Sequence, residues 1–131
     1  MRQHSDDYPA LKLRVEVPKR DYRLGEPVRF VMRLINNSDE EVRLAFPTSQ
    51  IFDFLIESTD GRISYSWSSD KMFLQVITER ELGPEEAIIQ EFDWKPPTAG
   101  KYRLKGFTVN FRIDGEAIHL EAEPVIFKVY R

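Results

Sequence analysis

The sequence predicts an all-β protein, an antiparallel β-sandwich of about eight or nine strands. Apolar and polar residues alternate with a period of two through most of the chain, as in strands that bury one face. Turn-forming residues interrupt this alternation roughly every ten residues, a spacing typical of sandwiches. Helical periodicity is absent over any useful length, and only residues 83–90 are candidates for a helical turn.

The first predicted strand covers residues 11–17, where apolar odd-numbered positions alternate with charged even-numbered ones, and Pro18 ends it. A turn around Gly25 leads to Pro27, which occupies the start of a strand, where a missing N–H costs least. The second predicted strand covers residues 28–35.

The middle of the chain holds its densest aromatic cluster. In the fourth predicted strand, residues 52–56, Phe52 and Phe54 share one face and Asp53 lies on the other. Asp60-Gly61 then signals a hairpin. The other predicted strands are residues 42–46, 63–67, 73–79, 88–94, 102–104 continued by 107–113, 118–120 and 125–129.

One predicted strand changes its inward parity. Tyr102 and Leu104 alternate on even numbers, whereas the apolar residues from Phe107 to Ile113 alternate on odd ones. A strand changes parity only through an extra residue, so we predict a β-bulge at Lys105-Gly106. Asp114-Gly115 is a second hairpin signal.

The alternation also predicts the core and a local motif. Gly100-Lys101-Tyr102, at the start of a late strand, resembles a tyrosine corner. The Asn36–Asp39 segment is a turn by residue type. The predicted core aromatics and aliphatics are Phe30, Leu44, Phe54, Trp67, Trp94 and Tyr102.

Length and composition indicate one ordinary soluble domain. The 131 residues predict a flexible N-terminal tail at residues 1–10 and a single sandwich at residues 11–131. With 19 basic and 22 acidic residues interspersed, the net charge of −3 argues against nucleic-acid binding. No membrane segment is expected, since no apolar run approaches roughly 20 residues.

Cysteine is absent, which excludes disulfides, zinc-thiolate sites and a cysteine nucleophile. The absence of disulfides and of a signal-peptide pattern predicts a cytoplasmic protein. We expect no metal and no cofactor, because neither histidine-ligand spacing, a calcium loop nor a glycine-rich phosphate loop is present.

An enzyme is the weakest of the functional classes. His4 lies in the tail and His119 in a predicted strand, where an exposed or hydrogen-bonded histidine is the ordinary interpretation. No nucleophile-elbow pattern marks a serine partner. Paired acid-base carboxylates remain open, since any two of the scattered acids could meet in space.

Two further features have a functional and a structural interpretation. Arg29, Arg33 and Arg43 could form a basic stripe, but neighbouring acidic residues favour cross-strand ion pairs on a solvated face. Trp67 and Trp94 could form a sugar-stacking platform, although their spacing fits core aromatics better.

The sequence resembles the BsuPI family, the intracellular proteinase inhibitor domain of Bacillus and its relatives, from about Leu11 to Leu104. The chain differs from the family's tendencies at Ser49 and Glu85, where glycines are usual. The likeness is carried by residues 25–30, 36–40, 49–54, 67–68, 72–75, 82–86, Trp94 and 100–102.

The resemblance implies an immunoglobulin-like sandwich and inhibition of a subtilisin-like serine protease through an exposed loop. The alternative is an immunoglobulin-like protein–protein interaction module without inhibitory activity. Residues 68–72 are the favoured loop because the resemblance flanks them, and Lys71, Met72 and Phe73 are its candidate anchors. Residues 47–50 and 95–98 are further candidates. The candidate binding residues are Ser68, Ser69, Asp70, Lys71, Met72, Thr48, Ser49 and Gln50.

Overall fold

Three sheets make up the computed structural model, which describes residues 9–131. The strands in chain order are β1 (Leu11–Glu16), β2 (Asp21–Arg23), β3 (Val28–Asn36), β4 (Val42–Phe46), β5 (Phe52–Ser58), β6 (Ser64–Ser66), β7 (Thr78–Leu82), β8 (Ala87–Trp94), β9 (Gly100–Thr108), β10 (Phe111–Ile113), β11 (Glu116–Ile118) and β12 (Val125–Tyr130). The alternation undercounts the strands because the three-residue strand β2 was not predicted and because the strand predicted over residues 102–113 is divided into β9 and β10. The tail predicted at residues 1–10 falls mostly, and His4 entirely, outside the described residues.

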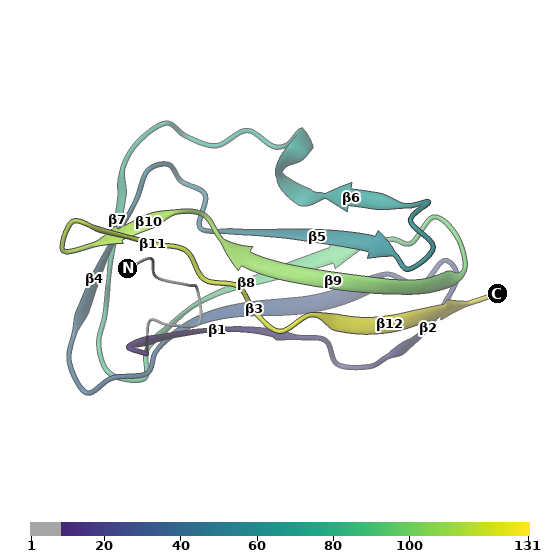
Figure 1. The fold of residues 1–131 in the computed structure, drawn as a ribbon, viewed down its shortest axis with the longest axis horizontal. Coiled ribbons are helices and arrows are strands. Elements are labelled where there is room, and N and C mark those ends of the chain that lie inside the picture. The colour runs from purple at the N-terminus through teal and green to yellow at the C-terminus, as the bar shows by residue number, and fades with distance from the viewer. Residues whose placement is uncertain (1–8) are drawn as a thin grey trace.

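Two sheets form the layers of the sandwich. One has the order β2-β12-β9-β5-β6 and the other β1-β3-β8. In Figure 1 the strands β6, β5, β9 and β12 of the first sheet succeed one another from top to bottom, while β3 and β8 of the second sheet lie fainter behind them. The third sheet, β11-β10-β4-β7, crosses the left end of the molecule in that view. Strands β2 and β12 pair in parallel, an exception to the antiparallel prediction.

The core between the layers is aromatic, as the alternation predicts. Phe30 of β3 meets Phe54 of β5 edge-on, with ring centroids 4.8 Å apart. Of the six predicted core residues, five are buried. Trp67 is the exception: it is half-buried and packs against the edge of the core.

The predicted bulge at Lys105-Gly106 is wrong. Strand β9 pairs with β5 without interruption from Tyr102 opposite Ser58 to Thr108 opposite Phe52. Gly106 faces inward, and a Cβ there would lie 2.5 Å from Val15 Cγ2 and 2.8 Å from a Met32 atom. A glycine therefore occupies an inward position because the opposite layer leaves no room for a side chain.

The parity change has another explanation. It occurs at Val109-Asn110, between β9 and β10. These two residues belong to neither strand, so β10 can present its odd-numbered residues inward after β9 has presented its even-numbered ones. The segment opposite β9 separately contains one extra residue, because Leu104 pairs with Val125 whereas Phe107 bridges to Glu121. Phe107 is half-buried on the outer side of β9.

Two secondary-structure predictions also need correction. The strand predicted at residues 73–79 begins only at Thr78, and residues 71–77 form no strand. Residues 83–90 form a turn followed by β8 rather than a helical turn. In that turn Glu85 has a φ of 65°, in the left-handed region that favours glycine. This is one of the two positions at which the resemblance predicts glycine.

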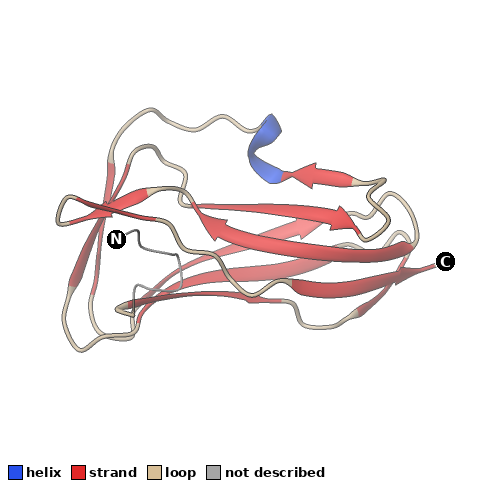
Figure 2. Cartoon of the chain, viewed as in Figure 1, coloured by secondary structure: helices blue, strands red, loops and turns tan. Residues whose placement is uncertain are grey.

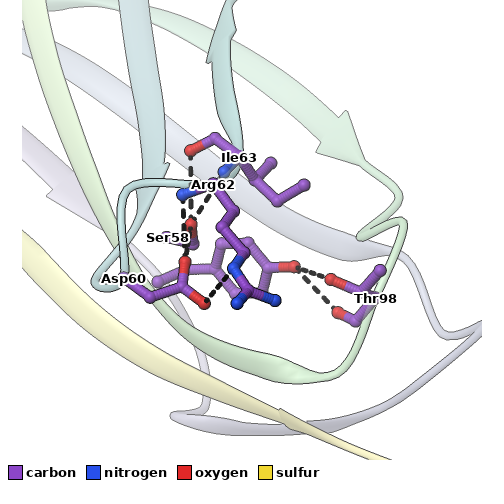
Figure 3. Close-up of polar contacts among 6 residues, drawn as sticks. Ser58, Asp60, Arg62, Ile63 and Thr98 are labelled. Atoms are coloured by element: carbon purple, nitrogen blue, oxygen red, sulfur yellow. Dashed lines mark hydrogen bonds and ion pairs between the residues drawn. The ribbon is translucent and has the colours of Figure 1, made fainter.

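The hairpins and the tyrosine corner are confirmed. Between β5 and β6, the Asp60 carboxylate accepts hydrogen bonds from Ser58 Oγ (2.7 Å) and Arg62 N–H (3.0 Å), as Figure 3 shows. A two-residue turn joins β10 to β11, with positive φ at both of its residues, Asp114 and Gly115. The Tyr102 hydroxyl donates to the carbonyl oxygen of Thr98 at 2.8 Å (Figure 3).

Candidate functional site

The most exposed apolar segment of the described chain follows β6. It begins with η2, the short 3-10 helix Trp67–Asp70. It continues through residues 71–77, which we call the outer loop; these residues form neither helix nor strand, and their first residue, Lys71, has an extended backbone. Figure 2 shows η2 in blue and the outer loop as a tan line along the upper edge. Met72 is 98% exposed, and the side chains of Leu74, Val76 and Ile77 are also exposed.

A buried carboxylate holds the start of this segment. Asp53 of β5 is only 8% exposed, although it lies on the side of the strand away from Phe52 and Phe54. Its carboxylate accepts hydrogen bonds from Ser68 Oγ (2.5 Å), Ser68 N–H (3.2 Å) and Phe54 N–H (2.8 Å). Asp53 therefore fixes η2 on the sheet beyond the end of β6.

Trp67 supports the outer loop from below. Its ring packs against Phe92, with centroids 5.0 Å apart, and stacks on Phe54 at 6.1 Å. The Trp67 ring also contacts the outer loop: the centroid of the Phe73 ring lies 5.7 Å from that of Trp67, and the Lys71 ammonium lies 5.4 Å from it. The tryptophan thus joins the core to two residues of the outer loop.

The turn formed by residues 47–50 holds the loop further along. Ser49 N–H donates to the carbonyl oxygen of Leu74 at 3.0 Å, and Leu74 N–H donates to Ser49 Oγ at 2.9 Å. Thr48 Oγ1 accepts from Gln50 N–H, and the Gln50 amide donates to the Phe52 carbonyl, which stiffens this turn. The 47–50 turn and the outer loop, which are separate in the sequence, are therefore hydrogen-bonded to each other.

The C-terminal end of the outer loop borders a surface pocket. The pocket has a volume of about 360 Å³, and its lining includes Phe46, Pro47, Ile77 and Phe111. Arg112 is also part of the lining. Beyond Ile77 the chain enters β7, whose pairing with β4 fixes the second end of the loop.

The candidate residues divide into supporting and accessible ones. Ser68 binds Asp53, and Ser69 Oγ donates to the carbonyl oxygen of Ser66, so both stabilise η2. Asp70 and Lys71 form an ion pair of 2.9 Å. This contact holds the pKa of Asp70 below, and that of Lys71 above, its ordinary value. Met72 is the fully accessible member.

The sequence interpretation missed Leu74, Val76 and Ile77 as surface residues, because it assigned them to a strand. Their pattern does contain a signal: apolar residues at both even and odd positions fit neither face of a strand that buries one side. The 95–98 connection differs from the outer loop. Pro96 is buried there, and Thr98 is engaged by Tyr102.

The alternative sites are not formed. Each arginine of the suggested basic stripe pairs with an acid on a neighbouring strand: Arg29 with Asp93, Arg33 with Glu16 and Arg43 with Glu81. The acids are not those adjacent in sequence, but the cross-strand interpretation is confirmed. Trp94 is buried and cannot share a sugar-stacking platform with Trp67.

His119 has the ordinary hydrogen-bonded environment. Its ring lies 5.8 Å from that of Phe107, and its Nε2 lies 3.3 Å from a Glu121 carboxylate oxygen. Among residues 9–131, no group of three or more histidine, aspartate or glutamate side chains is placed to hold a metal ion. The same part of the chain contains no helix with the length and apolar character needed to span a membrane.

Solved structures share the fold. The protein is similar to the CARDB domain of the PF1109 protein from Pyrococcus furiosus, with TM-scores of 0.51 to its crystal structure in complex with di-metal ions and 0.54 to its solution NMR structure. Sequence identities are 16% and 17%, and 94% of this chain aligns with 90% and 96% of those chains. Such identities support the fold alone.

A third similar structure is a much larger enzyme. For the beta-glucosidase from Listeria innocua in complex with glucose, the TM-score is 0.51 at 13% identity. The alignment covers 95% of this chain but 16% of the glucosidase, so the likeness concerns one part of that protein.

Sequence comparison identifies the family. No curated protein matches this sequence. Residues 15–112 match the family BsuPI, described as intracellular proteinase inhibitor. This match includes the aromatic cluster of β5, the 47–50 turn, η2 and the outer loop. The chain therefore belongs to the BsuPI family of intracellular proteinase inhibitors.

Proposed function

We propose that this protein inhibits a subtilisin-like serine protease by placing the outer loop in the active-site cleft. Family membership supplies the general function, proteinase inhibition. The observation that carries the proposal is the outer loop itself: an extended, exposed and apolar segment that is held to the domain at several points.

Extended shape and anchoring both matter for inhibition. A protease cleft takes an extended segment, and ordering a mobile segment on binding costs free energy. In the outer loop, Phe73 packs on Trp67 and Leu74 is hydrogen-bonded to Ser49. These contacts already order the loop in the free protein, so less conformational entropy is lost on binding. Loops on a rigid sandwich are suited to this task.

The same anchors would slow proteolysis. A substrate must let the new chain ends separate after cleavage, whereas this loop is fixed by Asp53 at its start and by β7 at its end. The separated ends would stay close and could rejoin. A bound loop with these properties acts as an inhibitor rather than as a substrate.

Inhibition by binding also requires no catalytic group in this chain. We therefore propose a protein partner and no enzymatic activity. Exposed methionine and isoleucine side chains offer the apolar contacts that dominate the centre of a protein interface.

The test is a titration of the purified protein against several subtilisin-like proteases, with a metalloprotease and a cysteine protease for comparison. Two exposed isoleucines provide matched variants: Ile77 in the outer loop is 72% exposed and Ile89 on β8 is 53% exposed. We expect Ile77→Ala to weaken inhibition about 10-fold, because a buried isoleucine contributes about 1.5–3 kcal/mol. Ile89→Ala should leave the inhibition constant unchanged.

Two results would contradict the proposal. Rapid digestion of the intact protein without loss of protease activity would favour an interaction module that does not inhibit. Inhibition that responds to Ile89→Ala but not to Ile77→Ala would place the protease on a different face.

A further inference from the structure

Trp67 holds two alternate residues of the outer loop. The Lys71 ammonium and the Phe73 ring both lie against the tryptophan, at 5.4 Å and 5.7 Å from its ring centroid. In an extended chain, residues two apart point to the same side and the residue between them points to the opposite side. The contacts of Lys71 and Phe73 therefore direct Met72 away from the domain, in agreement with its 98% exposure.

The neighbours of Met72 are occupied within the domain. Lys71 pairs with Asp70 at 2.9 Å, so its charge has a partner in addition to the tryptophan ring. Phe73 is half-buried. After it, both the N–H and the C=O of Leu74 bond to Ser49. Among the described residues, the free position between these attachments is Met72.

We propose that Met72 is the primary specificity residue of the inhibitory loop, that the target protease has a deep apolar pocket for a large unbranched side chain, and that the Met72–Phe73 peptide bond lies at its catalytic serine. This inference rests on the proposed function. A protease that requires a basic side chain is a poor target, because Lys71 would have to leave both Asp70 and Trp67.

The same placement predicts what slow cleavage produces. Hydrolysis of the Met72–Phe73 bond consumes one water and leaves a carboxyl group on Met72 and an amino group on Phe73. The first fragment stays attached through Asp53 and Ser68, and the second through Trp67 and Ser49. The cut protein would remain folded in one piece.

The experiment exchanges the specificity of the loop. Inhibition constants are measured for a subtilisin-type protease that prefers large apolar side chains and for a trypsin-type protease that prefers basic ones. The variants are Met72→Leu, Met72→Gly and Met72→Arg, and Ile89→Arg is the control with the same new charge on β8. Met72 is 98% exposed and Ile89 is 53% exposed, so none of these changes replaces a core side chain.

We expect the wild type and Met72→Leu to inhibit the subtilisin-type enzyme similarly and the trypsin-type enzyme poorly. Met72→Gly should weaken inhibition about 30-fold or more, as the loss of an interface hot spot does. Met72→Arg should gain inhibition of the trypsin-type enzyme, whereas Ile89→Arg should not. Mass spectrometry after long incubation should find the new chain ends at Met72 and Phe73.

Oxidation gives a second test on the unaltered chain. Hydrogen peroxide transfers one oxygen atom to an exposed thioether sulfur and is itself converted to water. Under mild conditions it should oxidise the exposed Met72 before the buried Met32. The polar sulfoxide should weaken inhibition by the wild type and leave Met72→Leu unaffected.

The outcomes separate the two proposals. If the wild type inhibits, Ile77→Ala is weaker and all Met72 variants behave as the wild type, then the outer loop is inhibitory but Met72 is not its specificity residue. If the first cut occurs at another bond, the proposed register is wrong. If the wild type inhibits no serine protease, the proposed function fails and this inference fails with it.

Discussion

Strand β5 and the outer loop are both rich in apolar residues, yet the domain treats them in opposite ways. In β5, Phe52, Phe54 and Ile56 are at most 1% exposed, whereas Leu74, Val76 and Ile77 of the outer loop are 56–72% exposed. Strand β5 has hydrogen-bonded neighbours on both sides, β9 and β6. The outer loop follows η2 and pairs with no strand of the described chain. Apolar composition alone therefore does not determine burial.

Asp53 marks the boundary between the two regions. Strand β6 ends at Ser66. The Ser68 N–H then donates to the side-chain carboxylate of Asp53 rather than to a backbone carbonyl of β5. The ladder stops there, and the chain turns through η2 away from the sheet. A buried side-chain acceptor thus ends the ladder, and the apolar side chains that follow in the outer loop remain accessible.

The largest expected effect comes from replacing one phenylalanine in each region by alanine and comparing the losses of stability. Phe54→Ala should reduce the free energy of unfolding by about 3–5 kcal/mol, because it removes a fully buried ring from the core. Phe73→Ala should cost about 1 kcal/mol or less, because its ring is half-exposed. Urea denaturation measures both. Equal losses would mean that the outer loop belongs to the core.

Asp53→Ala tests the boundary itself. The Ser68 N–H and Oγ would lose a charged acceptor, at a cost of about 1.5–3 kcal/mol. Hydrogen exchange of the Ser68 and Lys71 amides should accelerate more than that of the β9 amides. Asp93→Ala, an exposed aspartate on β8, is the control. Uniform acceleration across the sheet would show that Asp53 supports the whole domain rather than η2.

Gly106→Ala probes the close contact of the two layers. The added methyl group would overlap Val15 and Met32, and overpacking of this kind costs about 1–3 kcal/mol. Lys105→Ala, at the neighbouring half-exposed position, should cost less. Thermal unfolding gives both values. Inhibition at a temperature where the variant is folded should stay unchanged, since the atoms that the added methyl group would meet belong to Val15 and Met32 and not to the outer loop.

The smallest expected effect concerns Asp70 and Lys71 in the loop. The ammonium of Lys71 lowers the pKa of the Asp70 carboxyl, so this pair stabilises the fold above the ordinary pKa of aspartate and loses its contribution as the pH falls through the lowered value. Titration by NMR should place the midpoint of Asp70 below that of an ordinary aspartate. Lys71→Gln should return it toward the ordinary value; an unchanged midpoint would remove the ion pair from the description of the loop.

Local patterns predicted the parts of the fold that depend on neighbours in sequence. Alternation located β1, β3, β4 and β5, and Asp-Gly pairs located two hairpins because they suit the backbone angles of tight turns. The tyrosine corner was predictable for the same reason, since Tyr102 binds a carbonyl four residues earlier. The candidate loop at residues 68–72 was only partly predictable: its position followed from the family likeness, but its extension to Ile77 did not.

The sequence by itself determined an all-β chain with an aromatic core, its main turns and the absence of cysteine chemistry, because these follow from residue type and short spacing. Only the tertiary structure decided that Gly106 faces inward, since the reason lies in Val15 and Met32 on the opposite layer. It likewise decided that Asp53 is buried and that Ser49 holds Leu74. These contacts join residues far apart in sequence, and a short-range pattern contains no information on which distant group will supply them.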